Sequence, residues 1–303
     1  MSGLIGKMAV LFVLLVTGYL CARLKIVGAE FNKGLSKLVM NVFLAATILD
    51  SVINKELTLS GKELGFGILM MCLAMLITLG IAYVTPTLLG IKTGDRGMYR
   101  LLVAFMNNAF VGFPVVTALY GEESLFFASL LNIPFNLLLY TVGVMMLKSG
   151  EKGGFNIKKA INTPIIATLL AALIFTLRIP VPTIIDDVCG TLAAATVPLS
   201  MMCVGISLGP VSVKDALSHP RLYALSLVRL IVCPLAVWFV LHFFISDPVS
   251  LGIIVALMAT PTAIVCTILG LENGRDGIES SEEIFISTSL SMITIPVIMS
   301  FLT

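Results

Sequence analysis

Ten apolar runs alternate with short polar connections along the chain, and each run is about as long as the ~20 residues that span a bilayer as a helix. These runs, numbered here as segments 1 to 10, cover residues 4–23, 35–54, 64–89, 98–119, 124–147, 158–178, 187–209, 219–245, 249–270 and 282–302. The pattern predicts an all-α membrane protein with ten transmembrane helices.

Composition agrees with this interpretation. Of 303 residues, 58% are hydrophobic and 12% are charged, and the mean hydropathy is +1.07. A soluble domain carries about 25% charged residues. The connections are too short for a separate soluble domain, so we expect the lipid bilayer to be the main surrounding of the chain.

The distribution of positive charge predicts an orientation. Loops after even-numbered segments carry three basic residues, Lys55, Lys62 and Arg178. Loops after odd-numbered segments carry fourteen, namely Arg23, Lys25, Lys33, Lys37, Lys92, Arg96, Arg100, Lys148, Lys152, Lys158, Lys159, Lys214, Arg221 and Arg275. Because basic loops stay in the cytoplasm, we expect both termini on the extracytoplasmic side of the cell membrane.

The chain divides into two halves of five segments, residues 1–150 and 151–303, at the basic loop from Lys148 to Lys159. Five is odd, so the second half must enter the membrane from the opposite side, which is the pattern of an inverted repeat. Prolines recur in corresponding segments of the two halves: Pro114 and Pro261 in segments 4 and 9, and Pro134 and Pro296 in segments 5 and 10.

Segments 4 and 9 are each interrupted by a short group of polar and helix-breaking residues. The first interruption runs from Asn107 and Asn108 to Pro114, and the second is Thr260-Pro261-Thr262-Ala263. In hydrocarbon, a backbone that loses helical hydrogen bonds must find other partners or line a cavity. Broken helices at matching places in two halves indicate the substrate site of a transporter.

Such a site suits an anion, because half-helix N-termini present free N–H groups and the positive ends of helix dipoles. We expect Asn107 and Asn108 to hydrogen-bond the substrate, and Gly112 to allow close approach. The backbone after Pro114 and after Pro261, including Thr262, would cradle the anion. The alternative is a proline kink beside an amide that only packs against its neighbours.

Two polar stripes accompany the breaks. Segment 5 carries Ser129, Asn132, Asn136 and Tyr140, and segment 10 carries Ser287, Ser291 and Thr294, in each case at spacings of 3 or 4 that place them on one helical face. These stripes either line the cavity, with Asn132 and Asn136 as the better candidates, or form interhelical hydrogen bonds worth about 0.6 kcal/mol each.

Ionisable side chains inside the segments are few. Arg229 either neutralises a carboxylate substrate or extends to the cytoplasmic surface. Asp50, Asp186 and Asp187 lie near segment ends. Six dispersed cysteines and two isolated histidines form no metal-binding pattern. We expect no metal, cofactor or nucleic-acid partner, and no enzyme, because no cluster of acid, base and nucleophile is present.

The order of several short motifs resembles the auxin efflux carrier family over essentially the whole chain. The stretch from Asn107 to Pro114, with Gly112, is similar to the N-x-x-x-x-G-x-P signature of that family. Further matches are Gly18-Tyr19, the stretch from Leu38 to Leu44, Pro198-Leu199 followed by Gly205 to Leu208, and Ser287 to Ser291 continuing to Pro296. Ala45 stands where the family usually has proline, and Glu272-Asn273-Gly274 replaces the usual sequence after segment 9.

This resemblance implies a fold of two inverted five-helix repeats, similar to sodium–proton antiporters and bile-acid symporters, in which broken helices 4 and 9 cross. It implies that helices 1, 2, 6 and 7 form a scaffold and that helices 3–5 and 8–10 form a transport domain. It further implies a homodimer, carboxylate substrates such as malate, malonate or auxin-like acids, and a site asparagine at Asn107.

The leading hypothesis is therefore a secondary transporter of small organic anions that works by alternating access. The alternative is a sodium- or proton-coupled symporter of the bile-acid type. A channel is disfavoured, because channels usually show pore-lining rings or filter loops instead of two broken helices.

Overall fold

The computed structural model describes residues 2–55, 60–147, 161–275 and 277–302. Within these ranges the chain is helical and has no β-strand, apart from one isolated antiparallel bridge between Met106 and Thr262. The basic loop around Lys148 to Lys159, and with it the expected boundary at residue 150, lies outside the described residues.

Six helices in the described part are long and apolar enough to cross a membrane, which supports a multi-pass membrane protein. They cover Gly6–Arg23, Gly61–Leu88, Ser124–Leu147, Thr183–Leu208, Pro220–Leu241 and Ile278–Leu302. These correspond to the predicted segments 1, 3, 5, 7, 8 and 10. The helices in segments 4, 6 and 9 are shorter, and segments 4 and 9 are each divided into two helices.

The chain forms two compact units that differ from the two sequence halves. Unit 1 comprises Met1–Ile68, Ala109–Ile133 and Ile161–Pro210, and unit 2 comprises Leu69–Asn108, Pro134–Ala160 and Val211–Thr303. Helices α4 (Gly61–Leu88) and α7 (Ser124–Leu138) contribute residues to both units.

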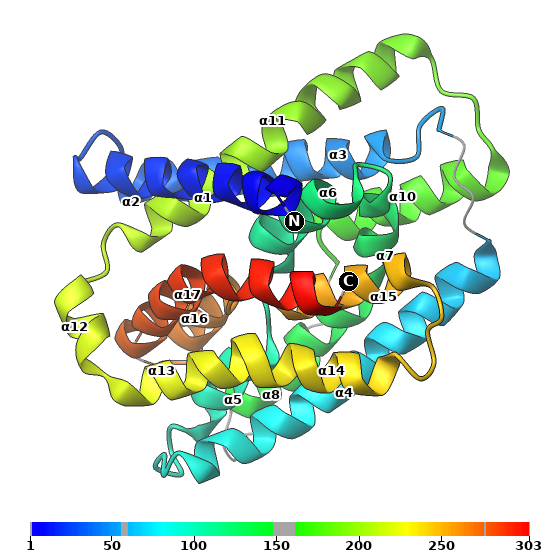
Figure 1. Cartoon of the computed structure of the whole chain (residues 1–303). Coiled ribbons are helices and arrows are strands. Elements are labelled where there is room, and N and C mark those ends of the chain that lie inside the picture. Colours follow the sequence, from blue (N-terminus) through cyan, green and yellow to red (C-terminus); the bar gives the residue numbers. More distant parts are fainter. Residues whose placement is uncertain (1, 56–59, 148–160, 276, 303) are drawn as a thin grey trace. The chain divides into compact units, whose positions relative to one another are not determined.

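Unit 1 is built around α11 (Thr183–Leu208), against which α1 (Ser2–Arg23) packs along much of its length (Figure 1). A Cβ atom at Gly18 would overlap the backbone of Met202, and one at Gly205 would overlap the backbone of Leu15. Small residues of this kind let membrane helices approach closely. The remaining helices of unit 1 are α2 (Ala29–Leu38), α3 (Leu44–Asp50), α6 (Phe113–Tyr120) and α10 (Thr163–Leu177).

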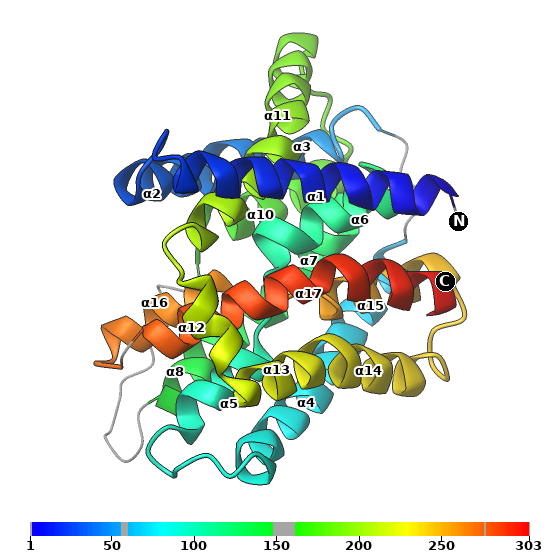
Figure 2. The ribbon, with the colours of Figure 1, turned by 60° about the vertical axis from the view of Figure 1, so that its left-hand side comes forward.

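In unit 2, α17 (Ile278–Leu302) packs beside α13 (Pro220–Leu227), and α14 (Cys233–Leu241) packs beside α15 (Pro248–Met258). Figure 2 shows α13 and α14 following one another along one side of α17. The other helices described in unit 2 are α5 (Arg96–Ala104), α8 (Val144–Leu147), α12 (Val213–Ser218) and α16 (Ile264–Glu272).

In the part of the chain that the structure describes, four π-helical turns interrupt the α-helices, at Val39–Phe43, Asn108–Gly112, Leu139–Gly143 and Val228–Val232. Two of them end two residues before a proline, Pro114 and Pro234. Proline has no N–H group for the regular i to i−4 hydrogen bond, which explains the local change of pitch. π turns occur frequently at functional sites. Asn108 and Arg229 lie in two of these turns, which supports their selection as candidate site residues.

Candidate substrate-binding site

The interruptions of segments 4 and 9 meet in unit 2 as two extended strands of backbone. The N–H of Asn107 donates to the carbonyl oxygen of Pro261 at 2.8 Å, and the N–H of Ala263 donates to that of Phe105 at 3.0 Å. These bonds flank the antiparallel bridge between Met106 and Thr262. Each broken helix therefore gives the other the backbone partners that the membrane interior demands.

Pro261 lies inside its extended segment, whereas Pro114 does not. The extended backbone of the first break comes earlier, at Phe105 to Asn107, and Pro114 stands in the first turn of α6. Proline is favoured there because the first N–H groups of a helix have no intrahelical partner. Gly112 has ordinary right-handed helical backbone angles.

Thr262 ties the second break to two neighbouring helices. Its hydroxyl donates to the carbonyl of Leu102 at 2.9 Å, and its N–H faces the hydroxyl oxygen of Ser287 at 3.4 Å. Thr262 is fully buried, and Asn107 and Asn108 are at most 4% exposed. The paired breaks thus lie in the interior of unit 2, and α16 begins directly after them at Ile264.

Arg229 is the largest fully buried side chain among the residues that the structure describes, and its guanidinium group lies against the ends of two helices. It donates to the carbonyls of Met258 at 2.6 Å, Val103 at 3.2 Å and Thr260 at 3.3 Å. These carbonyls belong to the C-terminal ends of α5 and α15 and to the residues just beyond α15. Each helix C-terminus carries a partial charge of about −0.5, so one guanidinium group offsets both. The side chain points to these carbonyls and does not extend to the surface.

Glu283 is a buried ionisable residue that the sequence analysis did not select. Its carboxylate is fully buried on α17, and Oε1 accepts a hydrogen bond from the hydroxyl of Ser226 at 3.2 Å. The side chains of Thr262 and Ser287 border it as well. The signal was available: Glu283 precedes Ser287 by four residues and Ser291 by eight, so it continues the polar stripe of segment 10 by one turn.

The structure buries the main members of both polar stripes. Ser129, Asn132 and Asn136 on α7 are at most 6% exposed, as are Ser287 and Ser291 on α17. The hydroxyl of Ser291 donates to the carbonyl of Thr288 within its own helix, at 2.7 Å.

The candidate residues divide between the two units. Asn107, Asn108, Asn136, Arg229, Pro261, Thr262 and Ser291 belong to unit 2, whereas Gly112, Pro114 and Asn132 belong to unit 1. Hydrogen bonds and the bridge between Met106 and Thr262 bring Asn107, Pro261, Thr262 and Arg229 together around the paired breaks.

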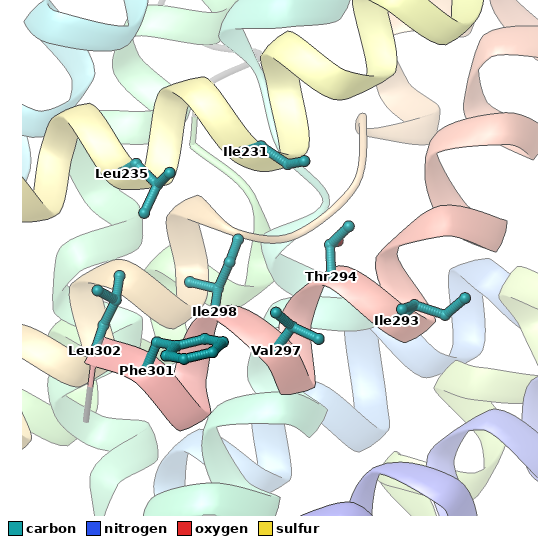
Figure 3. A pocket seen from close by; sticks show the side chains of 8 residues that line it. All are labelled: Ile231, Leu235, Ile293, Thr294, Val297, Ile298, Phe301 and Leu302. Carbon is teal, nitrogen blue, oxygen red and sulfur yellow. The ribbon is translucent and has the colours of Figure 1, made fainter.

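Two hollows in unit 2 have contrasting linings. Figure 3 shows an apolar hollow of about 330 Å³ between α17 and the residues Ile231 and Leu235; the α17 side is lined by Ile293, Thr294, Val297, Ile298, Phe301 and Leu302. It has no charged lining residue, so it is unsuited to a carboxylate. A smaller, polar hollow of about 210 Å³ is lined by Tyr99, His219, Pro220, Arg221, Leu222 and Glu279.

Polar pairs surround the second hollow at the start of α17. The hydroxyl of Tyr99 donates to Glu279 Oε2 at 3.0 Å, and Nδ1 of His219 lies 2.9 Å from Glu282 Oε2. The His219 side chain is 48% exposed, whereas that of Glu282 is 6% exposed. This end of α17 therefore carries three carboxylates, of which Glu283 is the deepest.

Comparison with known proteins places this chain in a family. The family model described as "Membrane transport protein" matches residues 4–156 and 153–299. An uncharacterized transporter from Methanothermobacter thermautotrophicus is 28% identical over 94% of this chain and 93% of its own length. The uncharacterized transporter MJ1031 from Methanocaldococcus jannaschii is 26% identical over 94% of each chain. The matches confirm the resemblance recognised in the sequence: the chain belongs to the membrane transport protein family, which includes the auxin efflux carriers.

Proposed function

We propose that this membrane transporter is a secondary carrier of small organic anions, with carboxylates such as malate, malonate or auxin-like acids as its substrate class. The observation that carries the proposal is the pairing of two broken segments around a buried cation. Extended backbone, two buried amides and the start of α16 converge there, and Arg229 supplies a permanent positive charge. Such a constellation attracts and hydrogen-bonds a carboxylate.

In this mechanism Asn107 and Asn108 hydrogen-bond the carboxylate, while Pro261 and Thr262 hold the backbone open beside it. Arg229 acts mainly by keeping the two helix ends in place, because its N–H groups already bond three carbonyls. Asn132, Asn136 and Ser291 line the substrate's path, and Gly112 and Pro114 shape the start of α6.

The same proposal includes the larger architecture. The predicted segments 1 to 10 would form ten membrane-spanning helices in two inverted repeats. Segments 1, 2, 6 and 7 would form a scaffold, and segments 3–5 and 8–10 would form a transport domain. Movement of one against the other would expose the site alternately to each side of the membrane. The carrier would work in the cell membrane as a homodimer, with both termini extracytoplasmic.

Ligand-induced thermal stabilisation of the purified protein tests the binding half of the proposal. A ligand that binds only the native state stabilises it by RT ln(1 + [L]/Kd), so weak binding is visible at high concentration. We expect a mono- or dicarboxylate from a panel to raise the unfolding temperature of the wild type and to have no effect on Asn107→Ala.

Asn273→Ala is the matched control, because the Asn273 amide lies at the end of α16, away from the breaks, and donates to the carbonyl of Leu269 at 2.8 Å. It should respond to the carboxylate as the wild type does. Equal stabilisation of Asn107→Ala and wild type would remove Asn107 from the site. Stabilisation by sodium alone would favour the sodium-coupled symporter instead.

A further inference from the structure

Glu283 is a fully buried carboxyl group in unit 2 to which the anion-binding proposal gives no role. Its side chain is inaccessible to solvent, and its second oxygen, Oε2, has no hydrogen-bond partner. Removing a charge from water is costly unless that charge is paired and hydrogen-bonded. A carboxylate in the membrane interior is therefore a functional candidate by default, and a proton relay is one of the roles such groups have.

The hydroxyl groups around Glu283 provide for both of its protonation states. In the ionised state, Oε1 receives the hydroxyl proton of Ser226, and the positive charge of Arg229 is near enough to act on the carboxylate. The bordering hydroxyls of Thr262 and Ser287 direct their own protons elsewhere, to the carbonyls of Leu102 and Ile284. A hydroxyl oxygen whose proton points elsewhere keeps lone pairs that can accept a hydrogen bond, so a protonated Glu283 has acceptors among its neighbours.

Glu283 is also joined to the substrate site through a short series of contacts. Ser287 is one helical turn along α17 and faces the N–H of Thr262. Thr262 in turn is bridged to Met106, beside Asn107. A change of charge at Glu283 is thus placed to act on an anion held at the paired breaks.

We propose that Glu283 carries the proton that is transported together with the anion. This inference rests on the proposed function. With Glu283 ionised and the site empty, the formal charges of Arg229 and Glu283 sum to zero. When Glu283 gains a proton on Oε2 and one monoanion binds, the sum is zero again.

Either ligand alone leaves one uncompensated charge in the interior of unit 2. Proton without anion gives +1, and anion without proton gives −1, and burial of an unpaired charge opposes both states. The helix ends that Arg229 faces add the same partial charge to every state. The empty and the doubly loaded site therefore still carry equal charge, and either ligand alone changes that charge by one unit. The empty and the doubly loaded site are the two states suited to cross the membrane, which couples one proton to each monoanion.

Other titratable groups near α17 do not provide the same balance. Most of them lie toward the end of α17 that begins at Ile278. They are Tyr99 on α5, Arg221 on α13, Lys214 and Asp215 on α12, and His219, Glu279 and Glu282. Cys266 on α16 is buried and uncharged as a thiol, Cys233 on α14 is also buried, and α15 carries no titratable residue. On α13, the half-buried Tyr223 lies three residues before Ser226, and the half-exposed His219 precedes Ser226 by about 10 Å along the helix.

The first test needs no substrate. An apolar carbodiimide modifies buried carboxyl groups in their protonated form, and peptide mapping by mass spectrometry then locates the adduct. We expect the purified wild type to be modified at Glu283 at acidic pH and to lose this modification as the pH rises. Absence of the adduct at every pH, or an adduct that does not depend on pH, would overturn the proposal.

The second test measures coupling in proteoliposomes, with radiolabelled malonate, malate and indole-3-acetate as probes and an entrapped pH indicator. Glu283→Gln keeps the shape of the protonated side chain but cannot release a proton. We expect this variant to exchange the probe across the membrane as the wild type does, yet to lose both accumulation driven by a pH gradient and proton uptake. Glu279→Gln, one turn earlier and exposed, is the matched control and should retain both.

The two arms separate this inference from the function on which it rests. If the wild type exchanges a carboxylate but neither moves protons nor responds to a pH gradient, proton coupling at Glu283 is wrong and the anion carrier stands. A dependence of accumulation on a sodium gradient instead would have the same meaning. If the wild type exchanges none of the probes, the proposed carrier fails, and the carbodiimide pattern still decides whether Glu283 binds and releases a proton.

Discussion

Arg229 shows how one side chain makes a broken membrane helix tolerable. A helix that ends inside the bilayer leaves carbonyl groups without partners, and each unsatisfied buried group costs about 1–3 kcal/mol. Arg229 reaches three such carbonyls, on Val103, Met258 and Thr260. Its planar fork of N–H donors can do this from one position.

Replacing Arg229 should therefore lower the stability of the protein even when no substrate is present. We expect Arg229→Met to lose roughly 3 kcal/mol or more, because three carbonyls become unsatisfied at once. Arg229→Lys should fall between this variant and the wild type, since an ammonium group cannot span all three carbonyls. Thermal unfolding followed with a thiol-reactive dye is suitable, because Cys189, Cys203, Cys233 and Cys266 are buried in the folded protein.

Arg221→Met is the control for this comparison. Arg221 lines the polar hollow at the start of α13 and bonds no carbonyl of a broken helix. A surface substitution of this kind usually changes stability by no more than about 0.5 kcal/mol. Equal unfolding temperatures for Arg229→Met and Arg221→Met would show that Arg229 does not hold the helix ends.

Asp247 has a simpler role at the N-terminus of α15. Burial raises the pKa of its carboxyl, but hydrogen bonds from the side chain and backbone of Ser250 and from the N–H of Val249 outweigh this and lower the pKa below its ordinary value. A depressed pKa means that the cap stabilises the fold at neutral pH and that this stability is lost as the pH falls through the folded-state pKa.

Two substitutions at this position separate the cap from its charge. Asp247→Ala should cost about 1 kcal/mol at neutral pH, the usual value of an N-cap. Asp247→Asn keeps a capping oxygen without a titratable group, so it should lose less stability on acidification than the wild type does. Unfolding temperatures measured at neutral and acidic pH provide the comparison, and identical acid sensitivity of Asp247→Asn and wild type would exclude the role of the carboxylate.

At the scale of elements, the closest packing in unit 1 depends on glycine. Gly18 and Gly205 belong to motifs that suggested the family, and the structure gives them a packing role between α1 and α11. The glycines allow backbone-to-backbone approach at a place where the bilayer provides no hydrophobic drive for association. These motifs therefore report on architecture and carry no information about the substrate.

Gly205→Ala should destabilise the protein by about 1–3 kcal/mol, the usual cost of overpacking, because the added methyl group meets the backbone of Leu15. Gly6→Ala on α1 is the matched control: a Cβ there would meet nothing within 4 Å. Since alanine is the better helix former, that variant should be about 0.5–1 kcal/mol more stable than the wild type. Equal effects of the two substitutions on the unfolding temperature would contradict the packing role of Gly205.

The breaks themselves were visible in the sequence, but their partners were not. Prolines and amides in the middle of apolar runs predicted interruptions in segments 4 and 9, and both are present. The antiparallel pairing of Met106 with Thr262 joins residues far apart in the chain, and no local pattern encodes it. Arg229 was left between two roles for the same reason, because its three acceptors lie on α5 and around the end of α15.

Glu283 was overlooked for a different reason. It lies beside Glu282 at the start of an apolar segment, where charged residues usually face water or headgroups. The structure separates the pair: Glu282 approaches the half-exposed His219, whereas Glu283 turns toward Ser226. The sequence held one signal that Glu283 faces the interior: its spacing from Ser287 and Ser291 places it on the same face of the helix.

At the scale of the whole molecule, the charge of the loops still awaits a test as a predictor of orientation. The described part of the chain contains six helices that are long and apolar enough to cross a membrane, but their length and composition do not show in which direction each one crosses. Fourteen basic residues in odd-numbered loops against three in even-numbered loops predict that both termini lie outside. A C-terminal alkaline phosphatase fusion should therefore be active and a C-terminal green fluorescent protein fusion dark; the reverse pattern would invert the topology.

The central claim is that a carboxylate crosses the membrane through the site formed by the two breaks. Counterflow in proteoliposomes tests it most directly: vesicles loaded with one unlabelled carboxylate are diluted into a trace of the same compound in labelled form. We expect the wild type to accumulate the label, Asn273→Ala to match it, and Asn107→Ala to be severely impaired while it remains folded. Counterflow of no carboxylate by the wild type, or full activity of Asn107→Ala, would contradict the account.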